Sequence, residues 1–214
     1  MHLSQVIFSD EKIFRVRPGG HVRCWVPNGE SKFKARYSIP SVQKPESILI
    51  WAAMRGDGRL CVRRCPCTLT AESYQAILQS ALQFLRRRHA TGQCPIASKS
   101  RYFPCSHPPC QFQQDGAPAH CAKSTRLWMQ KKKVVQFNAG VWPPVSPDLS
   151  PIEHVWPIAL RHLNRAVFSG KDQLWSALQQ AFAQITPAEI AALYQSMPQR
   201  LAAVVAAGGG PTRY

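Results

Sequence analysis

The sequence predicts an α/β domain in which helices cover a mixed β-sheet. Apolar runs and alternating apolar patterns dominate the first third of the chain, and both are typical of strands. The remainder alternates short apolar strands with segments whose apolar residues recur at helical spacing. The chain has 214 residues, of which 45% are hydrophobic and 18% charged, so it can fold as one globular domain around a buried core.

Five segments near the start of the chain are expected to form strands. The Asp57-Gly58 pair separates the last two of them, and Asp-Gly is typical of a tight hairpin turn, so we assign Asp57 a structural role. The predicted strands span residues 5–9, 13–17, 22–26, 47–54 and 59–63.

The first helix should begin after Thr70, its predicted N-cap, because apolar residues then recur on one helical face as far as Leu85. Residues 86–110 show no periodicity and are expected to form a long basic surface loop. Short strands are then expected at 110–115 and 134–137, and helices at 122–132, 151–165, 171–185, 187–195 and 201–207.

The charge balance is strongly positive. Lys and Arg number 27 and Asp and Glu only 11, which gives a formal net charge of +16. A surface with this excess attracts polyanions. No apolar run approaches the roughly 20 residues of a membrane helix, and the first residues lack the features of a signal peptide. We therefore expect a polyanionic partner, no membrane association and a reducing compartment.

Eight cysteines in such a compartment are expected to be reduced thiols rather than disulfides. Several of them lie between residues 61 and 121, close to His107 and His120, and could supply zinc ligands. They lack the paired C-x-x-C spacing of zinc sites, so a zinc-stabilised structural module is an alternative with little support.

Three of the few acidic residues stand at positions that suit chemistry. Asp10 ends an apolar strand, Asp115 ends a second strand, and Glu153 opens a helix. Functional groups of open α/β sheets gather beyond the carboxyl ends of the strands. Three carboxylates that meet there would repel one another unless Mg²⁺ or Mn²⁺ neutralised them. Two such ions, roughly 3.5 to 4 Å apart, could support phosphoryl transfer.

Three stretches around these acids form a specific pattern: residues 6–11 (VIFSDE), 112–120 (FQQDGAPAH) and 142–156 (WPPVSPDLSPIEHVW). Together they resemble the catalytic domain of mariner-superfamily DDE transposases. The resemblance implies a ribonuclease H-like fold, with a mixed five-stranded sheet flanked by helices. It also implies that Asp10, Asp115 and Glu153 are the catalytic residues and the ligands of two Mg²⁺ or Mn²⁺ ions.

By the same resemblance, we expect metal-dependent DNA strand cleavage and strand transfer, the reactions of DNA transposition and integration. DNA would be the partner and the nucleus the compartment. Residues 25–30 resemble the loop through which the family's subunits and DNA ends are clamped, which makes a homodimer a candidate assembly, although a simple hairpin connection fits these residues equally well.

The chain also departs from the family pattern. It begins almost at the first catalytic strand, so the N-terminal helix-turn-helix modules are expected to be absent and DNA binding to be salt-sensitive and indifferent to sequence. The interval between Asp10 and Asp115 is longer than usual for the family, so we expect a basic loop insertion, or a decayed segment, at about 86–110 in a single domain spanning 1–214.

Each candidate site residue has a structural alternative. Ser150 and Glu153 have the spacing of a capping box, in which Glu153 would only satisfy backbone amides. Asp148 competes with Glu153 as the third acid, but it lies in the proline-rich loop before the helix. Asp115 could belong to an ordinary turn, and Asp10 with Glu11 to a solvated edge.

His120 is expected to be a hydrogen-bonded structural residue, although contact with a phosphate or with the metal pocket is the other reading. The basic runs at 86–88 and 131–133 could bind DNA, act as a nuclear import signal or simply be solvated.

Pro157 raises a rival function. It lies four residues after Glu153 inside the predicted helix, where an interior proline costs roughly 3 kcal/mol and kinks the helix. A kink beside a metal ligand would displace it. The rival to an active nuclease is therefore a non-catalytic DNA-binding remnant of a transposase.

Overall fold

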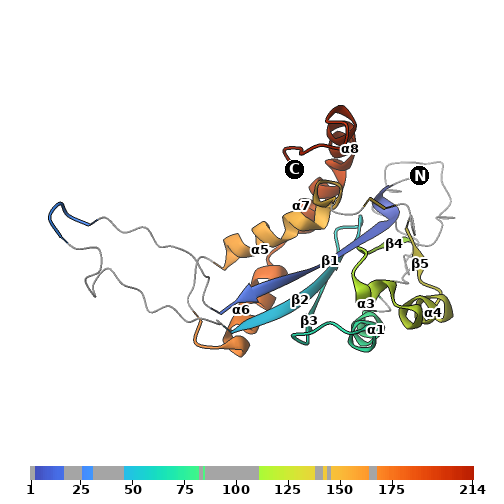
Figure 1. The fold of residues 1–214 in the computed structure, drawn as a ribbon, viewed down its shortest axis with the longest axis horizontal. Coiled ribbons are helices and arrows are strands. Elements are labelled where there is room, and N and C mark those ends of the chain that lie inside the picture. Colours follow the sequence, from blue (N-terminus) through green and yellow to red (C-terminus); the bar gives the residue numbers. More distant parts are fainter. Residues whose placement is uncertain are drawn as a thin grey trace.

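The computed structural model describes residues 3–16, 26–30, 46–81, 84, 111–137, 142–143, 146–163 and 168–214. A five-stranded mixed sheet with the strand order β3-β2-β1-β4-β5 lies at its centre (Figure 1). The central strand β1 pairs antiparallel with β2 on one side and parallel with β4 on the other. The strands are β1 (Val6–Arg15), β2 (Ser47–Met54), β3 (Leu60–Cys65), β4 (Gln111–Gln113) and β5 (Val135–Gln136). The predicted mixed five-stranded sheet is confirmed.

The first two predicted strands, 5–9 and 13–17, are one continuous strand, β1. The polar residues Asp10, Glu11 and Lys12 suggested a break, but all three stay in register with β2. Pairing with a long neighbouring strand has overridden the local sequence preference. Of the predicted strand 22–26, only Val26 is among the described residues, and it is not in a strand.

A tight turn joins β2 to β3, as the Asp57-Gly58 pair predicted. The Asp57 carboxylate accepts a hydrogen bond from the backbone N–H of Arg59 at 3.3 Å and lies 3.5 Å from Nε of Arg55. Gly58 follows with φ of +86°, a conformation that favours glycine. The structural role of Asp57 is confirmed.

Alternation along β1 sends side chains to two cores. Ile7 faces a core with α1 (Ala71–Ser80), α3 (Pro118–Cys121) and α4 (Lys123–Lys131), whereas Val6 and Phe8 face the other side. Four helices belong to that side: α5 (Val155–His162), α6 (Lys171–Ala183), α7 (Pro187–Gln195) and α8 (Met197–Ala206), of which α8 extends beyond α7 (Figure 1). The predicted cover of the sheet by helices is confirmed, and the helices lie on both of its faces.

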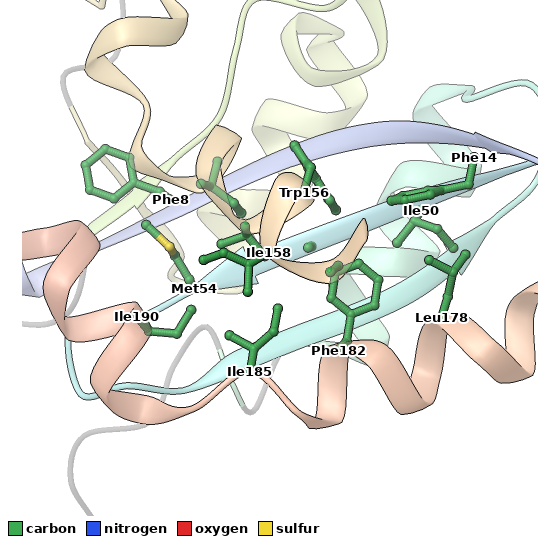
Figure 2. Close-up of a cluster of buried hydrophobic side chains, with 14 of the residues drawn as sticks. Phe8, Phe14, Ile50, Met54, Trp156, Ile158, Leu178, Phe182, Ile185 and Ile190 are labelled. Atoms are coloured by element: carbon green, nitrogen blue, oxygen red, sulfur yellow. The ribbon is translucent and has the colours of Figure 1, made fainter. Parts of the chain in front are cut away.

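The larger core joins the sheet to α5, α6 and α7. Trp156 of α5 is buried between Phe14 of β1 and Phe182 of α6, with ring centroids 6.1 and 6.0 Å apart in edge-to-face arrangements. Figure 2 shows these rings together with Ile50, Met54 and the aliphatic side chains of the helices. This packing fixes α5, and hence the turn before it, against the middle of β1.

The helix predicted at 151–165 begins differently. Residues Pro151–His154 form a 3₁₀ turn, η5, and the α-helix α5 starts only at Val155. Pro157 is therefore the third residue of α5, in the first turn, where an N–H has no α-helical acceptor and proline is tolerated. The predicted interior kink is wrong, and this argument for a non-catalytic remnant fails.

The other predicted helices are present, and all of them except α7 have shifted ends. Thr70 caps α1 through a capping box with Ser73, as expected from the N-cap prediction. The helix α8 starts at Met197 rather than at residue 201, and α3 was not predicted. Two further 3₁₀ turns are η1 (Leu3–Gln5) and η4 (Pro147–Leu149). The predicted insertion at 86–110 lies outside the described residues.

Among the described residues, none of the helices has the length and apolar character needed to cross a membrane. Cys61 and Cys65 are buried free thiols, and Cys67 and Cys121 are exposed free thiols. The described part of the chain contains no cysteine in a group of potential metal ligands, so the zinc alternative gains no support there. Cys94, Cys105 and Cys110 lie outside the described residues.

Candidate active site

Asp10, Asp115 and Glu153 line one pocket of about 820 Å³. The parallel pairing of β1 with β4 explains how two of them meet. Phe8 pairs with Gln113, and Asp10 and Asp115 each lie two residues beyond that pair, at the same edge of the sheet. Asp10 lies within β1 rather than at its end, because β1 continues past it to pair with β2. Glu153 reaches the pocket from η5.

Asp10 is held by a neighbour from the core. The indole Nε1 of Trp156 donates to Oδ2 of Asp10 at 2.8 Å. Burial, and next the negative charge of Glu153, raise the pKa of Asp10 to about 7, although hydrogen bonds from Trp156 and the Glu11 backbone act in the opposite direction. The ionised form of Asp10 is therefore destabilised by burial and by repulsion from Glu153, and a bound cation would offset this repulsion.

Asp115 has the opposite electrostatics. Its Oδ1 atom accepts the backbone N–H of Ala117 at 2.9 Å and lies 2.6 Å from Nδ1 of His120. The hydrogen bond with His120 is the largest cause of a lowered pKa for Asp115. The side chain is 60% exposed and ionised at neutral pH, which suits a metal ligand at the mouth of the pocket.

The two structural alternatives for the third acid have different outcomes. Ser150 makes no side-chain capping bond at the start of η5, and only its carbonyl oxygen accepts the N–H of Glu153, at 3.2 Å. The capping-box interpretation is therefore wrong. The carboxylate of Asp148 accepts from the backbone N–H of Leu149 at 3.1 Å and from Oγ1 of Thr212 at 3.4 Å, and Asp148 is not among the residues that line the pocket.

A tighter cluster lies beside the predicted triad. Potential ligand atoms of Glu11, Asp115 and His120 all lie within 4.8 Å of one another. Among the described residues, these three are the one set of His, Cys, Asp or Glu side chains that is close enough to share a metal ion. Asp10 and Glu153 are not members, so the predicted triad shares the pocket without such close mutual contact. Like-charged carboxylates repel, and three of them pack less tightly than two carboxylates around a histidine.

His120 is a buried, hydrogen-bonded residue, as predicted, and it also contacts Asp115. Its pKa rises to about 9: burial lowers it, and the bonds and charges of Asp115 and Glu11 raise it by more. Glu11 was missed by sequence reasoning, which treated it as part of a solvated edge. The sequence feature that could have revealed it is the alternation of side chains along β1. This alternation places Glu11 on the face opposite Asp10, toward α1 and α3.

The donor set fits a divalent cation. Asp10, Asp115 and Glu153 offer carboxylate oxygens, which Mg²⁺ and Mn²⁺ prefer. The thiol of Cys121 also lines the pocket, but it belongs to no group of potential metal ligands among the described residues. Trp156 holds Oδ2 of Asp10, and His120 holds Oδ1 of Asp115. Hydrogen bonds of this kind typically orient metal ligands. The raised pKa of Asp10 adds an electrostatic reason for a cation at this position.

Comparison with known families decides what kind of site this is. Residues 5–175, which include all three acids, match the family model described as DDE superfamily endonuclease. The chain belongs to the DDE endonuclease superfamily. It is 29% identical over 211 residues to the Tc1 transposase of Caenorhabditis elegans and 28% identical to the Tcb2 transposase of Caenorhabditis briggsae. Each alignment covers 97% of this chain and 70% of the relative, so the predicted resemblance is confirmed.

Solved structures agree on the fold of this DDE chain. The catalytic domain of Mos1 mariner transposase superposes with a TM-score of 0.66 and 19% identity, over 99% of this chain and 85% of that one. The Mos1 paired end complex with Mn gives a TM-score of 0.70 and 19% identity, and this chain spans 57% of that protein's length. The predicted ribonuclease H-like fold is confirmed.

The pocket of the DDE domain also has a basic and an aromatic wall. Arg126, an exposed residue of α4, lines it, as do Phe137 and Trp142, whose ring centroids are 5.7 Å apart. Sequence reasoning did not single out Arg126 or the ring of Trp142. A cation at the rim of an acidic pocket suits a phosphate group that approaches the carboxylates.

Proposed function

We propose that this chain is the catalytic domain of a DNA transposase, in which Asp10, Asp115 and Glu153 hold divalent cations for DNA strand cleavage and strand transfer. One observation carries the proposal. Acids from β1, from the segment after β4 and from η5 line a single pocket in a chain that matches the DDE endonuclease model over residues 5–175.

The residues have separable tasks in this proposal. Two divalent cations, when bound, would activate the attacking oxygen and stabilise the leaving oxygen of a phosphoryl transfer. Asp10 and Asp115, on adjacent parallel strands, would hold cations between them, and Glu153 would complete the ligand set. Trp156 and His120 orient the two aspartates through the hydrogen bonds described above.

DNA is the partner in this proposal. The formal net charge of +16 supports it, because phosphate contacts release counterions and drive sequence-independent binding. Arg126 lines the same pocket, and its charge would attract the DNA backbone toward the three acids. Mos1 is known in a paired end complex and in a strand transfer complex, and these relatives support the same chemistry for this chain.

A homodimer and a nuclear location belong to the same proposal. A paired end complex of Mos1 supports an assembly that holds two DNA ends. Sedimentation of the chain with short DNA duplexes measures this directly: a complex with two protein chains supports the homodimer, and a complex with one chain contradicts it. A fluorescent fusion in cells measures the location, and a signal excluded from the nucleus contradicts it.

Nicking of supercoiled plasmid in Mg²⁺ or Mn²⁺ tests the proposed function. The wild-type chain should convert supercoiled to open-circular DNA, and Glu153→Gln should reduce the rate at least ~100-fold because it removes a charged ligand. Glu72→Gln, on the exposed start of α1, is the matched control and should nick like the wild type. Equal nicking by Glu153→Gln and wild type would contradict the proposal and point to a contaminating nuclease.

A further inference from the structure

We propose that Glu11 and His120 are a buried pair of positioning residues that fix the Asp115 carboxylate for metal binding. Nδ1 of His120 lies 2.6 Å from Oδ1 of Asp115, and its Nε2 atom lies 3.3 Å from Oε1 of Glu11. The inference deepens the proposed function and rests on it, since it needs Asp115 to be a metal ligand.

The imidazole of His120 cannot easily turn away from this arrangement. Its side chain is 1% exposed, and its ring centroid lies 4.1 Å from that of Tyr74 with an interplanar angle of 34°. Tyr74 in turn donates to Oε1 of Gln114 at 2.7 Å, and Gln114 donates to the His120 carbonyl oxygen at 3.4 Å. Tyr74 therefore holds the ring of His120, and Gln114, which is itself bonded to Tyr74, holds its backbone.

The chain brings this pair together through three elements. Asp115 follows β4, and the short helix α3 places His120 back against it. Glu11 comes from β1, on the strand face that points toward α1 and α3. Its side chain is 14% exposed, which is rare for a glutamate without a charged or hydrogen-bonding partner. His120 is that partner, so this residue of α3 connects Glu11 of β1 with Asp115 in the segment after β4.

The consequence for Asp115 is a carboxylate with one defined orientation. Oδ1 accepts both from the Ala117 backbone and from His120, so the plane of the carboxylate is set and the other oxygen, Oδ2, remains as the metal-binding atom. An aspartate that is 60% exposed would otherwise sample several rotamers. Groups of this kind around metal ligands typically change metal affinity 10- to 100-fold.

The same three residues could instead be a metal site in their own right, because their ligand atoms lie within 4.8 Å of one another. The contacts argue against that reading. A separation of 2.6 Å between Nδ1 and Oδ1 is a charge-assisted hydrogen bond, so Nδ1 carries a proton there and cannot also bind a cation. Nε2 lies 3.3 Å from Oε1 of Glu11, where the two groups attract each other as an ion pair rather than through a hydrogen bond.

Mn²⁺ binding to the full chain, measured by electron paramagnetic resonance without DNA, tests this inference. His120→Phe keeps a ring beside Tyr74 but has no N–H, and it should weaken Mn²⁺ binding about 10- to 100-fold. His120→Asn places an amide N–H near the Nδ1 position and should stay within about 3-fold of wild type, while His120→Gln should be weaker than Asn. Glu11→Leu removes the carboxylate that faces Nε2 of His120 and should weaken binding about 10-fold.

Two further variants separate this inference from the proposed function. Asp115→Asn should lose Mn²⁺ binding, and wild-type binding by it would overturn the proposed function itself. Glu72→Gln is the control and should bind Mn²⁺ like the wild type. If Asp115→Asn loses binding while His120→Phe and Glu11→Leu stay within 2-fold of wild type, the positioning role is wrong and the proposed function stands.

Activity provides a second readout that a purely structural role would not move. The positioning role predicts a lower kcat for nicking by Glu11→Leu with an unchanged KM for DNA, and partial recovery of the rate at high Mn²⁺. If His120→Phe does not fold, as judged by circular dichroism, the order of His120→Asn above His120→Gln decides the question. Equal Mn²⁺ affinities for those two variants would overturn the inference.

Discussion

The indole Nε1 of Trp156 donates a hydrogen bond to Oδ2 of Asp10 at 2.8 Å. This bond joins the first turn of α5 to the middle of β1, and Glu153 lies just before that turn. Trp156 is 1% exposed and packs on Phe14 and Phe182. One tryptophan therefore connects the larger core to the acidic pocket.

Trp156→Phe should separate packing from hydrogen bonding at this position. Phenylalanine keeps an aromatic ring in the core but leaves Oδ2 of Asp10 without its indole donor. We expect the free energy of unfolding to fall by about 1 to 3 kcal/mol and Mn²⁺ binding to weaken. Urea denaturation measures the first quantity and isothermal titration calorimetry the second. Trp128→Phe, on α4, is the control, and equal Mn²⁺ affinities for both variants would contradict a role for the indole at Asp10.

The metal-free chain should lose stability as the pH rises from 5 to 9. The pKa of Asp10 is raised from 3.8 to about 7, so its contribution to stability is full below pH 4 and is lost as the pH rises toward 7. The pKa of His120 is raised from 6.5 to about 9, so its contribution is full below pH 6.5 and is lost between there and pH 9. The melting temperature, recorded with EDTA across this range, measures the effect.

Asp10→Asn is the matched variant for that measurement. It removes the half-buried carboxyl whose pKa is raised by burial and by the negative charge of Glu153, so it should flatten the pH dependence below pH 7 and leave the part above pH 7 in place. At pH 8 without metal it should be at least as stable as the wild type. The ionised carboxylate of Asp10 is destabilising there, because it is partly buried and lies near the negative charge of Glu153 with no cation between them. An unchanged slope below pH 7 would show that Asp10 does not have the raised pKa.

Gly58→Ala should destabilise the chain through a contact between distant elements. Gly58 has φ of +86°, and an added Cβ would lie 2.6 Å from Cβ of Pro187 at the start of α7. We expect a loss of about 3 kcal/mol, since both the backbone strain and the clash oppose it. Gly29→Ala is the control, because Gly29 has φ of +88° with nothing within 4 Å and should lose only about 1 kcal/mol. Equal losses in urea denaturation would remove the clash from the explanation.

Arg200 of α8 should be far more costly to replace than Arg213, the next arginine along the chain. Its side chain is 1% exposed, donates to Oγ of Ser196 at 2.8 Å and to the Asp148 carbonyl oxygen at 3.2 Å, and lies 4.7 Å from the ring centroid of Tyr214. Arg200→Met should lower the free energy of unfolding by about 3 kcal/mol. Arg213→Met, at an exposed position, should change it by less than about 0.5 kcal/mol. Thermal denaturation that ranks the two variants equally would contradict the buried role of Arg200.

Much of the fold could be predicted from the sequence because hydrophobic periodicity is local. The strand Ser47–Met54 and the helix Pro187–Gln195 have the predicted bounds, since their apolar patterns are long and bounded by Pro, Ser or Gly. The continuity of β1 and the 3₁₀ turn before α5 were not predictable in this way. The first depends on pairing with β2, and the second on Pro157 and on the packing of Trp156 against Phe14.

The residues of the candidate site show the same difference between local and tertiary information. Asp10, Asp115 and Glu153 could be singled out because each lies in a short, distinctive sequence motif. Glu11 and Trp156 could not, because their roles come from contacts across 109 or more positions of the chain, between Glu11 and His120 or between Trp156 and Asp10. Strand alternation tells which face a residue occupies, but the partner on that face is a property of the tertiary structure.

Crystals grown with Mn²⁺ and measured at the manganese absorption edge give the most direct test of where this chain binds its cations. Anomalous difference peaks should lie among the carboxylates of Asp10, Asp115 and Glu153, with Nδ1 of His120 still hydrogen-bonded to Asp115. A peak coordinated by His120 and Glu11, or fully occupied Mn²⁺ only at sites remote from the pocket, would contradict the assignment of the three acids as metal ligands.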